Sequence, residues 1–256
     1  MIANYHTHTW RCKHAEGEER AYVEQAIAAG TRILGFSDHT PYPFPNGYVS
    51  YFRMAPSQAE GYFTTLSDLK REYAGQIEIR IGVEAEYYPE HFQALLELLT
   101  QYPCEYLILG QHFTNNELDG VYSGRATADE AVLMQYVSQV LEGLSTGKFT
   151  YLAHPDLLNW RGAEEVYRRE TTRLCRGVKA LGLPLEINLL GLYEGRHYPN
   201  GTFWQIAGEV GNTAILGCDA HQPWALNRTD IEEAGRELAA EYGIPLVDTV
   251  NLRSIV

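Results

Sequence analysis

The strongest constraint on the fold is a repeated unit in which a short apolar run is followed by a segment with helical periodicity. The apolar runs predict strands at residues 2–5, 32–37, 77–83, 106–110, 149–153, 185–188 and 214–217. The segments after them predict helices at residues 18–29, 57–73, 90–100, 128–144, 164–181, 203–210 and 230–242. Strands that alternate with helices indicate a parallel sheet with right-handed crossovers.

Seven such units in 256 residues favour a closed barrel over an open, doubly wound sheet. No G-x-G-x-x-G sequence follows the first predicted strand and no Walker-type loop occurs, which weakens the dinucleotide-binding and P-loop interpretations. Residues 247–250 are a candidate for one further short element. Since no linker or shift of composition divides the chain, we expect a single α/β barrel domain over residues 1–256.

Composition places the chain among ordinary globular proteins, with 45% hydrophobic and 21% charged residues. A net charge of −13 argues against nucleic-acid binding through a basic face. No apolar run approaches the ~18 residues of a membrane span, and no secretory signal pattern opens the sequence. The four cysteines are scattered, which favours free thiols over a disulfide framework. We therefore expect a cytoplasmic protein without nucleic-acid or membrane partners.

Two histidines, His6 and His8, follow the first predicted strand. In an extended chain residues i and i+2 project to the same side, so the two imidazoles would point at one spot. Such a pair can chelate a transition metal. Taken alone, the pair fits a metal site and an exposed polar strand end equally well.

The other histidines favour the metal interpretation. Nine residues with ligand-type side chains stand at or just after the C-terminal ends of predicted strands: His6, His8, His14, His39, Glu84, His112, His154, Asp219 and His221. In a parallel barrel these ends meet on one face, where active sites form. Because one catalytic zinc takes about three protein ligands, we expect two to three divalent ions, with zinc, iron and manganese all compatible.

Glu84 is the natural bridge between ions, because a carboxylate offers two oxygens. A hydroxide held between two ions would then be the nucleophile. Asp38 and Asp219 are the candidate catalytic residues. Asp38 would orient a ligand or the bridging water, with a structural cap as the alternative. In a hydrolysis at this site, Asp219 or a metal-bound water would give a proton to the group that leaves.

Six short motifs resemble those of the PHP (polymerase and histidinol phosphatase) superfamily. They are Tyr-His-Thr-His at 5–8, Ser-Asp-His-Thr-Pro at 37–41, Gly-Val-Glu at 82–84, Gly-Gln-His-Phe at 110–113, Ala-His-Pro-Asp at 153–156 and Cys-Asp-Ala-His at 218–221. Within the superfamily the chain is most similar to the monofunctional L-histidinol-phosphate phosphatases. That narrower likeness rests on Arg53-Met54, residues 82–87 and 154–157, and Glu-Ile-Asn at 186–188 with the segment through Pro199.

The resemblance implies a distorted (β/α)7 TIM-like barrel with a trinuclear metal site at the C-terminal ends of the strands. It implies three ligand sets: His6, His8, Glu84 and Asp219; Glu84, His112 and His154; and His14, His39 and His221. The family usually has Ser-Val-His where this chain has Gly-Gln-His at 110–112. Gln111 is therefore expected to change the hydrogen bonding beside a retained ligand.

The activity implied by the resemblance is hydrolysis of L-histidinol phosphate, in histidine biosynthesis. Arginine suits phosphate recognition because its planar guanidinium binds two oxygens at once. The candidate phosphate and substrate contacts are Arg161, Arg196, Arg53, Arg125 and His197. The candidate partners for the amine and imidazole are Glu86, Tyr87, Glu194 and the aromatic side chains of residues 40–56. The loop 40–56 is expected to be a lid, with a fixed Ω-loop as the alternative.

Three other functions stay open. The first is a PHP phosphoesterase for another small phosphate ester. The second is an amidohydrolase-like metal hydrolase, which also begins with His-x-His but often carries a bridging carbamylated lysine after the fourth strand. Residues 110–112 contain no lysine. The third is a PHP module kept for structure or interaction, which would have lost ligands, whereas all nine positions are present here.

Overall fold

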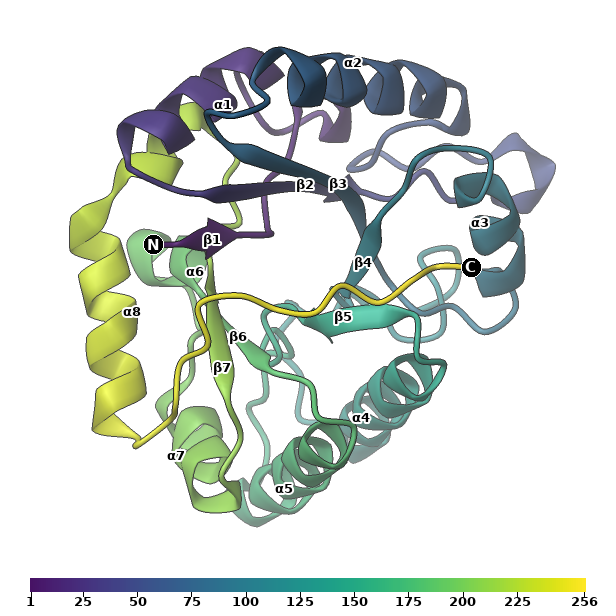
Figure 1. The fold of residues 1–256 in the computed structure, drawn as a ribbon. Helices are drawn as coiled ribbons and strands as arrows, with labels where there is room; N and C mark the ends of the chain where they lie inside the picture. The colour runs from purple at the N-terminus through teal and green to yellow at the C-terminus, as the bar shows by residue number, and fades with distance from the viewer.

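Seven parallel strands form one sheet in chain order, and the sheet curls into a nearly closed, distorted TIM-like barrel (Figure 1). The computed structural model describes the backbone of residues 1–256 and every side chain except that of Asn46. The strands are β1 (Ala3–Asn4), β2 (Ile33–His39), β3 (Glu78–Ala85), β4 (Tyr106–Leu109), β5 (Phe149–Leu152), β6 (Leu185–Asn188) and β7 (Ala214–Gly217). Thr7 and Ala220 close the ring as a parallel bridge beyond β1 and β7.

Helices cover the outside of the barrel (Figure 1). They are α1 (Glu19–Ala28), α2 (Ala59–Glu72), α3 (Phe92–Leu99), α4 (Glu130–Ser145), α5 (Glu164–Ala180), α6 (Leu189–Glu194), α7 (Gly201–Val210) and α8 (Thr229–Glu241). Four 3-10 turns join them: η1 (Trp10–Cys12), η2 (Pro45–Gly47), η3 (Pro56–Gln58) and η4 (Pro223–Asn227). The amphipathic pattern explains the packing, since α2 buries Tyr62, Leu66 and Leu69 at helical spacing. Among the helices described, none is both long and apolar enough to cross a membrane.

The predicted alternation of strands and helices is confirmed, with differences at the boundaries. β2 and β3 run two residues further than predicted, so Asp38, His39 and Glu84 lie inside strands rather than after them. The short helix α6 follows β6 directly and was not predicted. Residues 247–250 form no strand, because the chain leaves the sheet after Leu246 bridges Ala214 at the start of β7.

One end of the barrel is closed by the C-terminal segment. Tyr106, Tyr151 and Ile215 belong to a buried cluster of strand residues, and Val247 and Val250 are among the tail residues packed against it. In Figure 1 this segment, coloured yellow, crosses the mouth of the barrel toward α3. Because it lies where the strands begin, only the C-terminal ends of the strands remain open to form a site.

The ring of Tyr106 occupies space that two glycines leave free. Its phenolic oxygen lies 2.8 Å from the carbonyl oxygen of Tyr5 and 3.0 Å from that of Phe36. A Cβ atom at Gly35 on β2, or at Gly82 on the adjacent strand β3, would overlap Tyr106. The glycines therefore let one large side chain hydrogen-bond to two strands across the barrel.

Replacing Gly82 by alanine is expected to lower the free energy of unfolding by about 1–3 kcal/mol, because the added methyl group overlaps Tyr106. Gly61→Ala is the matched control, since a Cβ there meets no atom within 4 Å on helix α2. That control should raise stability by up to about 1 kcal/mol. Urea unfolding of both variants checks the pair, and equal stability of Gly82→Ala and wild type would contradict the packing.

Candidate metal centre and active site

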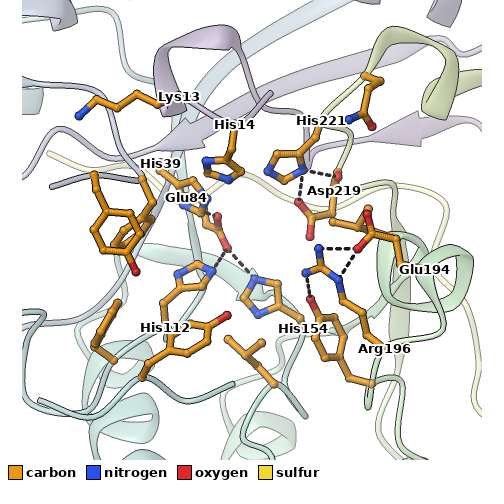
Figure 2. A pocket seen from close by; sticks show the side chains of 18 residues that line it. Lys13, His14, His39, Glu84, His112, His154, Glu194, Arg196, Asp219 and His221 are labelled. Atoms are coloured by element: carbon orange, nitrogen blue, oxygen red, sulfur yellow. Dashed lines mark hydrogen bonds and ion pairs between the residues drawn. The ribbon is translucent and has the colours of Figure 1, made fainter. Parts of the chain in front are cut away.

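The nine predicted ligands come together at the open end of the barrel. Figure 2 shows those that line its cavity, which are all of them except His6 and His8. β2 and β3 carry His39 and Glu84 directly. The other seven lie in the segments that follow β1, β4, β5 and β7. Parallel strands therefore deliver residues that are far apart in the sequence to one place, as the position of the histidines predicted.

The ligand-type atoms fall into overlapping groups of three, each within 4.8 Å of one another. These groups include His14, His39 and His221; His6, His8 and Asp219; and His6, Glu84 and His154. His112 joins them through its Nε2 atom, which lies 3.6 Å from Glu84 Oε1. The two carboxylate oxygens of Glu84 face different groups, since Oε1 lies 2.7 Å from His154 Nε2 and Oε2 lies 3.0 Å from His39 Nδ1.

Two glycines make room for buried carboxylates at this end. A Cβ atom at Gly110, just after β4, would overlap the carboxylate of Glu84. A Cβ atom at Gly217, at the end of β7, would overlap the carboxylate of Glu186. The Gly-Gln-His motif thus supplies space at its first position as well as a candidate ligand at its third.

Three buried carboxylates stand behind three of the imidazoles. The Nδ1 atom of His6 lies 2.8 Å from Glu186 Oε2, and that of His112 lies 2.8 Å from Glu86 Oε1. The Nδ1 atom of His8 lies 3.3 Å from Asp38 Oδ1. A carboxylate that accepts from Nδ1 fixes the ring orientation and leaves Nε2 free to bind a metal.

Asp38 is fully buried and does not line the cavity. Besides facing His8, it accepts a hydrogen bond from the backbone N–H of His39 at 2.8 Å and one from the hydroxyl of Thr9. These contacts are compatible with an orienting role of Asp38 toward His8, and its part in catalysis stays a prediction. Asp219, by contrast, lines the cavity, with Oδ1 3.0 Å from His8 Nε2.

Backbone geometry adds to the placement of the ligands. His154 and Asp219 have positive φ angles of 27° and 48°, which are uncommon for residues with a Cβ atom. The Nδ1 atoms of His14 and His221 face backbone carbonyls, at 2.8 Å from Cys12 O and 2.9 Å from Asp219 O, respectively, and that of His221 also lies 3.4 Å from Asp219 Oδ1. Their Nε2 atoms are consequently available as ligands.

The cluster holds carboxylates ionised among buried imidazoles. Burial raises the pKa of Glu84, but the neighbouring imidazoles, His112 first among them, hold it well below its usual range. Burial lowers the pKa of His6, but Glu186 and Asp219 raise it to about 10. Without a metal ion, His6 therefore keeps a proton, because the surrounding carboxylates stabilise positive charge at this position.

Four buried atoms of the candidate ligands have no hydrogen-bond partner among the described residues: His39 Nδ1, Glu84 Oε2, His154 Nδ1 and His221 Nε2. Burial and the neighbouring His8 lower the pKa of His221 to about 3, so its imidazole is neutral at physiological pH. A neutral imidazole and an ionised carboxylate are the forms that bind metals. The residues present therefore fit divalent cations.

A cavity of about 510 Å³ opens above the cluster. Of the five predicted phosphate contacts, only Arg196 lines it (Figure 2). The Arg196 guanidinium pairs with Glu194 at 2.6 Å and donates to the Tyr198 hydroxyl at 2.6 Å. Glu194, predicted as a substrate contact, also lines the cavity.

The other four predicted phosphate contacts lie outside this cavity. Arg53 is buried and its guanidinium pairs with two carboxylates, so it does not face the substrate space. Arg161 and His197 line a separate pocket beside Asn200, and His197 Nε2 lies 2.7 Å from the carbonyl oxygen of Leu157. The remaining candidate, Arg125, is exposed in the segment between β4 and α4.

Glu86 and Tyr87 also differ from their predicted roles. Both side chains are buried and neither lines the cavity. Tyr87 Oη donates to Glu142, and its backbone N–H donates to Gln111 Oε1 at 3.0 Å. Gln111 also donates to the carbonyl oxygen of Phe113 at 2.7 Å, so this departure from the family motif ties the segments after β3 and β4 together.

The loop 40–56 contributes a wall of the cavity through Tyr51 and Phe52. Its base is packed, since Tyr42 and Phe44 are buried and the rings of Tyr42 and Tyr88 lie 4.9 Å apart. The loop therefore combines the fixed base of an Ω-loop with a tip over the ligands. Movement of that tip as a lid stays a prediction.

The sequence analysis assigned no role to Lys13, and it named Glu186 only as part of the Glu-Ile-Asn motif. Lys13 lines the cavity and donates from Nζ to the carbonyl oxygen of Ser50 in the loop 40–56. Glu186 stands behind His6 and is held by Asn188, whose Nδ2 donates to it at 2.8 Å. Their positions were a usable signal, because Lys13 precedes His14 in the same segment and Glu186 lies near the end of a predicted strand.

In the metal-free protein, stability is expected to depend on the proton held by His6. A pKa raised from 6.5 to about 10 gives the folded state a contribution that is complete below pH 6.5 and is lost as the pH rises through 10. The melting temperature of chelated protein should therefore fall between these pH values. Zinc-saturated protein should not show this particular loss, because the ion replaces the proton. A flat profile for the chelated protein would contradict the assignment.

Comparisons with known proteins identify the family to which this chain is similar. A family model described as the PHP domain matches residues 4–189. A probable histidinol-phosphatase of Schizosaccharomyces pombe is 30% identical over 249 residues, covering 87% of this chain and 81% of its own. A probable histidinol-phosphatase of Deinococcus radiodurans is 29% identical over 233 residues, covering 87% of each chain.

A solved structure supports the same fold. The histidinol phosphate phosphatase from Lactococcus lactis, complexed with Zn, L-histidinol and phosphate, matches with a TM-score of 0.72 and 20% identity. The match covers 98% of this chain and 97% of that chain. The family match includes seven of the nine candidate ligands, and the curated relatives extend over most of the chain. This chain belongs to the PHP family.

Proposed function

We propose that this protein is a metal-dependent phosphomonoesterase that hydrolyses L-histidinol phosphate to L-histidinol and inorganic phosphate. The observation that carries the proposal is the set of nine ligand-type side chains grouped around Glu84 beneath one cavity. The curated relatives named histidinol-phosphatase support the choice of substrate. So does the Lactococcus lactis enzyme, which was solved with Zn, L-histidinol and phosphate.

Three divalent ions would use the nine residues without leaving any over. His6, His8, Glu84 and Asp219 would hold the first ion, Glu84, His112 and His154 the second, and His14, His39 and His221 the third. Glu84 can serve two of these sets because Oε1 lies 2.7 Å from His154 Nε2, whereas Oε2 lies 3.6 Å from His6 Nε2 and 3.7 Å from His8 Nε2. The zinc in the Lactococcus lactis structure supports zinc as one of the ions.

When bound, divalent ions polarise phosphoryl oxygens and lower the pKa of coordinated water to about 7. Asp219 is the cavity-facing residue best placed to move protons. Burial raises its pKa, but the imidazoles of His6 and His8 hold it well below the usual range. An ionised Asp219 must take up a proton before it can give one. It would therefore accept the proton of the attacking water and pass it to the leaving alkoxide.

The rim of the cavity suits a substrate that carries both charges. Arg196 can donate to phosphate oxygens, and Glu194 beside it can accept from an ammonium group. In the free protein these two side chains neutralise each other at 2.6 Å. Phe52 and Phe113, whose ring centroids lie 5.8 Å apart, offer apolar faces to an imidazole ring. Each end of L-histidinol phosphate would thus find a complementary partner.

Phosphate release from L-histidinol phosphate should far exceed release from other small monoesters, because only this substrate would contact both Glu194 and Arg196. The measurement is kcat/KM for a panel that includes a sugar phosphate, a nucleoside monophosphate and p-nitrophenyl phosphate. Equal or higher values for another ester would overturn the substrate assignment while leaving a metal-dependent phosphoesterase.

Glu84→Gln should lower kcat by at least about 100-fold and reduce the metal content, because an amide cannot replace a bridging carboxylate. Glu194→Gln is the matched control at the rim. It should keep its metals and raise KM by about tenfold through the loss of one charged hydrogen bond. Elemental analysis and steady-state kinetics check both variants. Wild-type metal content and activity in Glu84→Gln would contradict the proposed centre.

A further inference from the structure

Arg53 joins three segments behind the cavity wall. Its side chain is buried, and Nη1 donates to the carbonyl oxygen of Thr40, just after β2, at 3.1 Å. Nη2 donates to Glu86, just after β3, at 2.9 Å and to Glu117, in the segment after β4, at 3.0 Å. A planar guanidinium can serve several fixed acceptors at once, which makes Arg53 an anchor for the loop 40–56.

One oxygen of Glu86 is shared between this anchor and a candidate ligand. Oε1 of Glu86 lies 2.9 Å from Arg53 Nη2 and 2.8 Å from His112 Nδ1. Since His112 would bind metal through Nε2, the same imidazole would touch the ion on one side and Glu86 on the other. A continuous chain of contacts therefore runs from the metal centre through His112 and Glu86 to Arg53.

The loop segment held by Arg53 covers the ligands. Phe52, the residue before it, lies with its ring centroid 5.3 Å from that of His39 and 5.8 Å from that of Phe113. Tyr51 is 76% exposed at the mouth of the cavity. The position of Arg53 therefore sets where this wall stands above the imidazoles.

The buried network is short of donors. Two carboxylates share one guanidinium, and Oε2 of Glu86 and Oε1 of Glu117 have no hydrogen-bond partner among the described residues. In a dry network of this kind each remaining contact matters more, because an unpaired buried charge is costly. An N–H of His112 that points at Glu86 is thus strongly favoured.

We infer that Arg53 is a positioning residue that couples the loop 40–56 to metal binding at His112 through the shared carboxylate of Glu86. With a cation bound at Nε2, the Nδ1–H of His112 would be a stronger donor, and its hydrogen bond to Glu86 would strengthen the anchor of the loop. Coupling between two sites is reciprocal, so an anchored loop must also raise the affinity for the ion. The inference rests on the proposed function only in requiring metal at His112.

The test is chymotrypsin cleavage after Tyr51 in zinc-loaded and chelated protein, followed by mass spectrometry. In the wild type, removal of zinc should raise the cleavage rate about five- to tenfold, the low end of usual allosteric couplings. Glu86→Gln and Arg53→Met should bring this ratio close to one. Arg53→Lys serves if Arg53→Met fails to fold. Cleavage after Tyr151, which is buried in β5, reports global unfolding.

Glu117→Gln is the matched control. It weakens the anchor of the loop but leaves the contacts of Glu86 with His112 and Arg53 in place, so the basal rate should rise while the zinc-dependent ratio persists. A general loosening of the structure would abolish the ratio in all variants alike. Because coupling is reciprocal, the zinc affinity of Arg53→Met should be lower than that of the wild type by the same factor by which zinc slows cleavage in the wild type. Competition with a chelating dye measures this affinity.

A wild-type ratio of one, with zinc shown by elemental analysis to have been removed, would overturn the coupling. Retention of the wild-type ratio in both Glu86→Gln and Arg53→Met would also overturn it. A chain that takes up no zinc would overturn both this inference and the proposed function. A metal-loaded enzyme that prefers another ester would overturn the substrate assignment alone.

Discussion

Buried negative charge at one end of the barrel is the constraint on which the site depends. Glu84, Glu86, Glu186, Asp38 and Asp219 are all at least 95% buried there. Carboxylates in such surroundings persist only when cations or hydrogen-bond donors compensate them. The chain provides imidazoles for most of this compensation, and the Arg53 guanidinium, the Thr9 hydroxyl and the Asn188 amide supply further donors. A cluster of buried carboxylates would be unstable without compensating charge, and for the same reason it attracts divalent ions.

The barrel can accommodate this concentration of buried charge because one of its ends provides the stable packing and the other carries the charged site. At the end where the strands begin, Tyr106 and the C-terminal segment fill the interior with apolar contacts and backbone hydrogen bonds. At the other end the strands hold their last residues rigidly, so that His39 and Glu84 need no flexible loop to bring them together. The order of the packed end supports the strained, charged arrangement of the open end.

Much of the fold, and the meeting of nine ligand-type side chains at one end of the barrel, could be predicted from the sequence. The positions of His39 and Glu84 could be predicted because both lie at the C-terminal ends of parallel strands, which meet at one end of the barrel. The supporting carboxylates were not, because the pairing of His6 with Glu186 depends on the register of β1 and β6 across the barrel. Arg53 was assigned to phosphate for a similar reason. Its direction is set by Glu117, which no local pattern connects to it.

The closing contact of the barrel, Thr7 with Ala220, joins segments near opposite ends of the sequence. Since His8 and Asp219 flank this contact, the first ligand set contains residues that meet only when β7 docks beside β1. Contacts of such long range form late and slowly during folding. A chain still leaving the ribosome would present its early histidines without their acidic partner. The ion would therefore bind tightly only after folding is complete, and it would then stabilise the closed barrel.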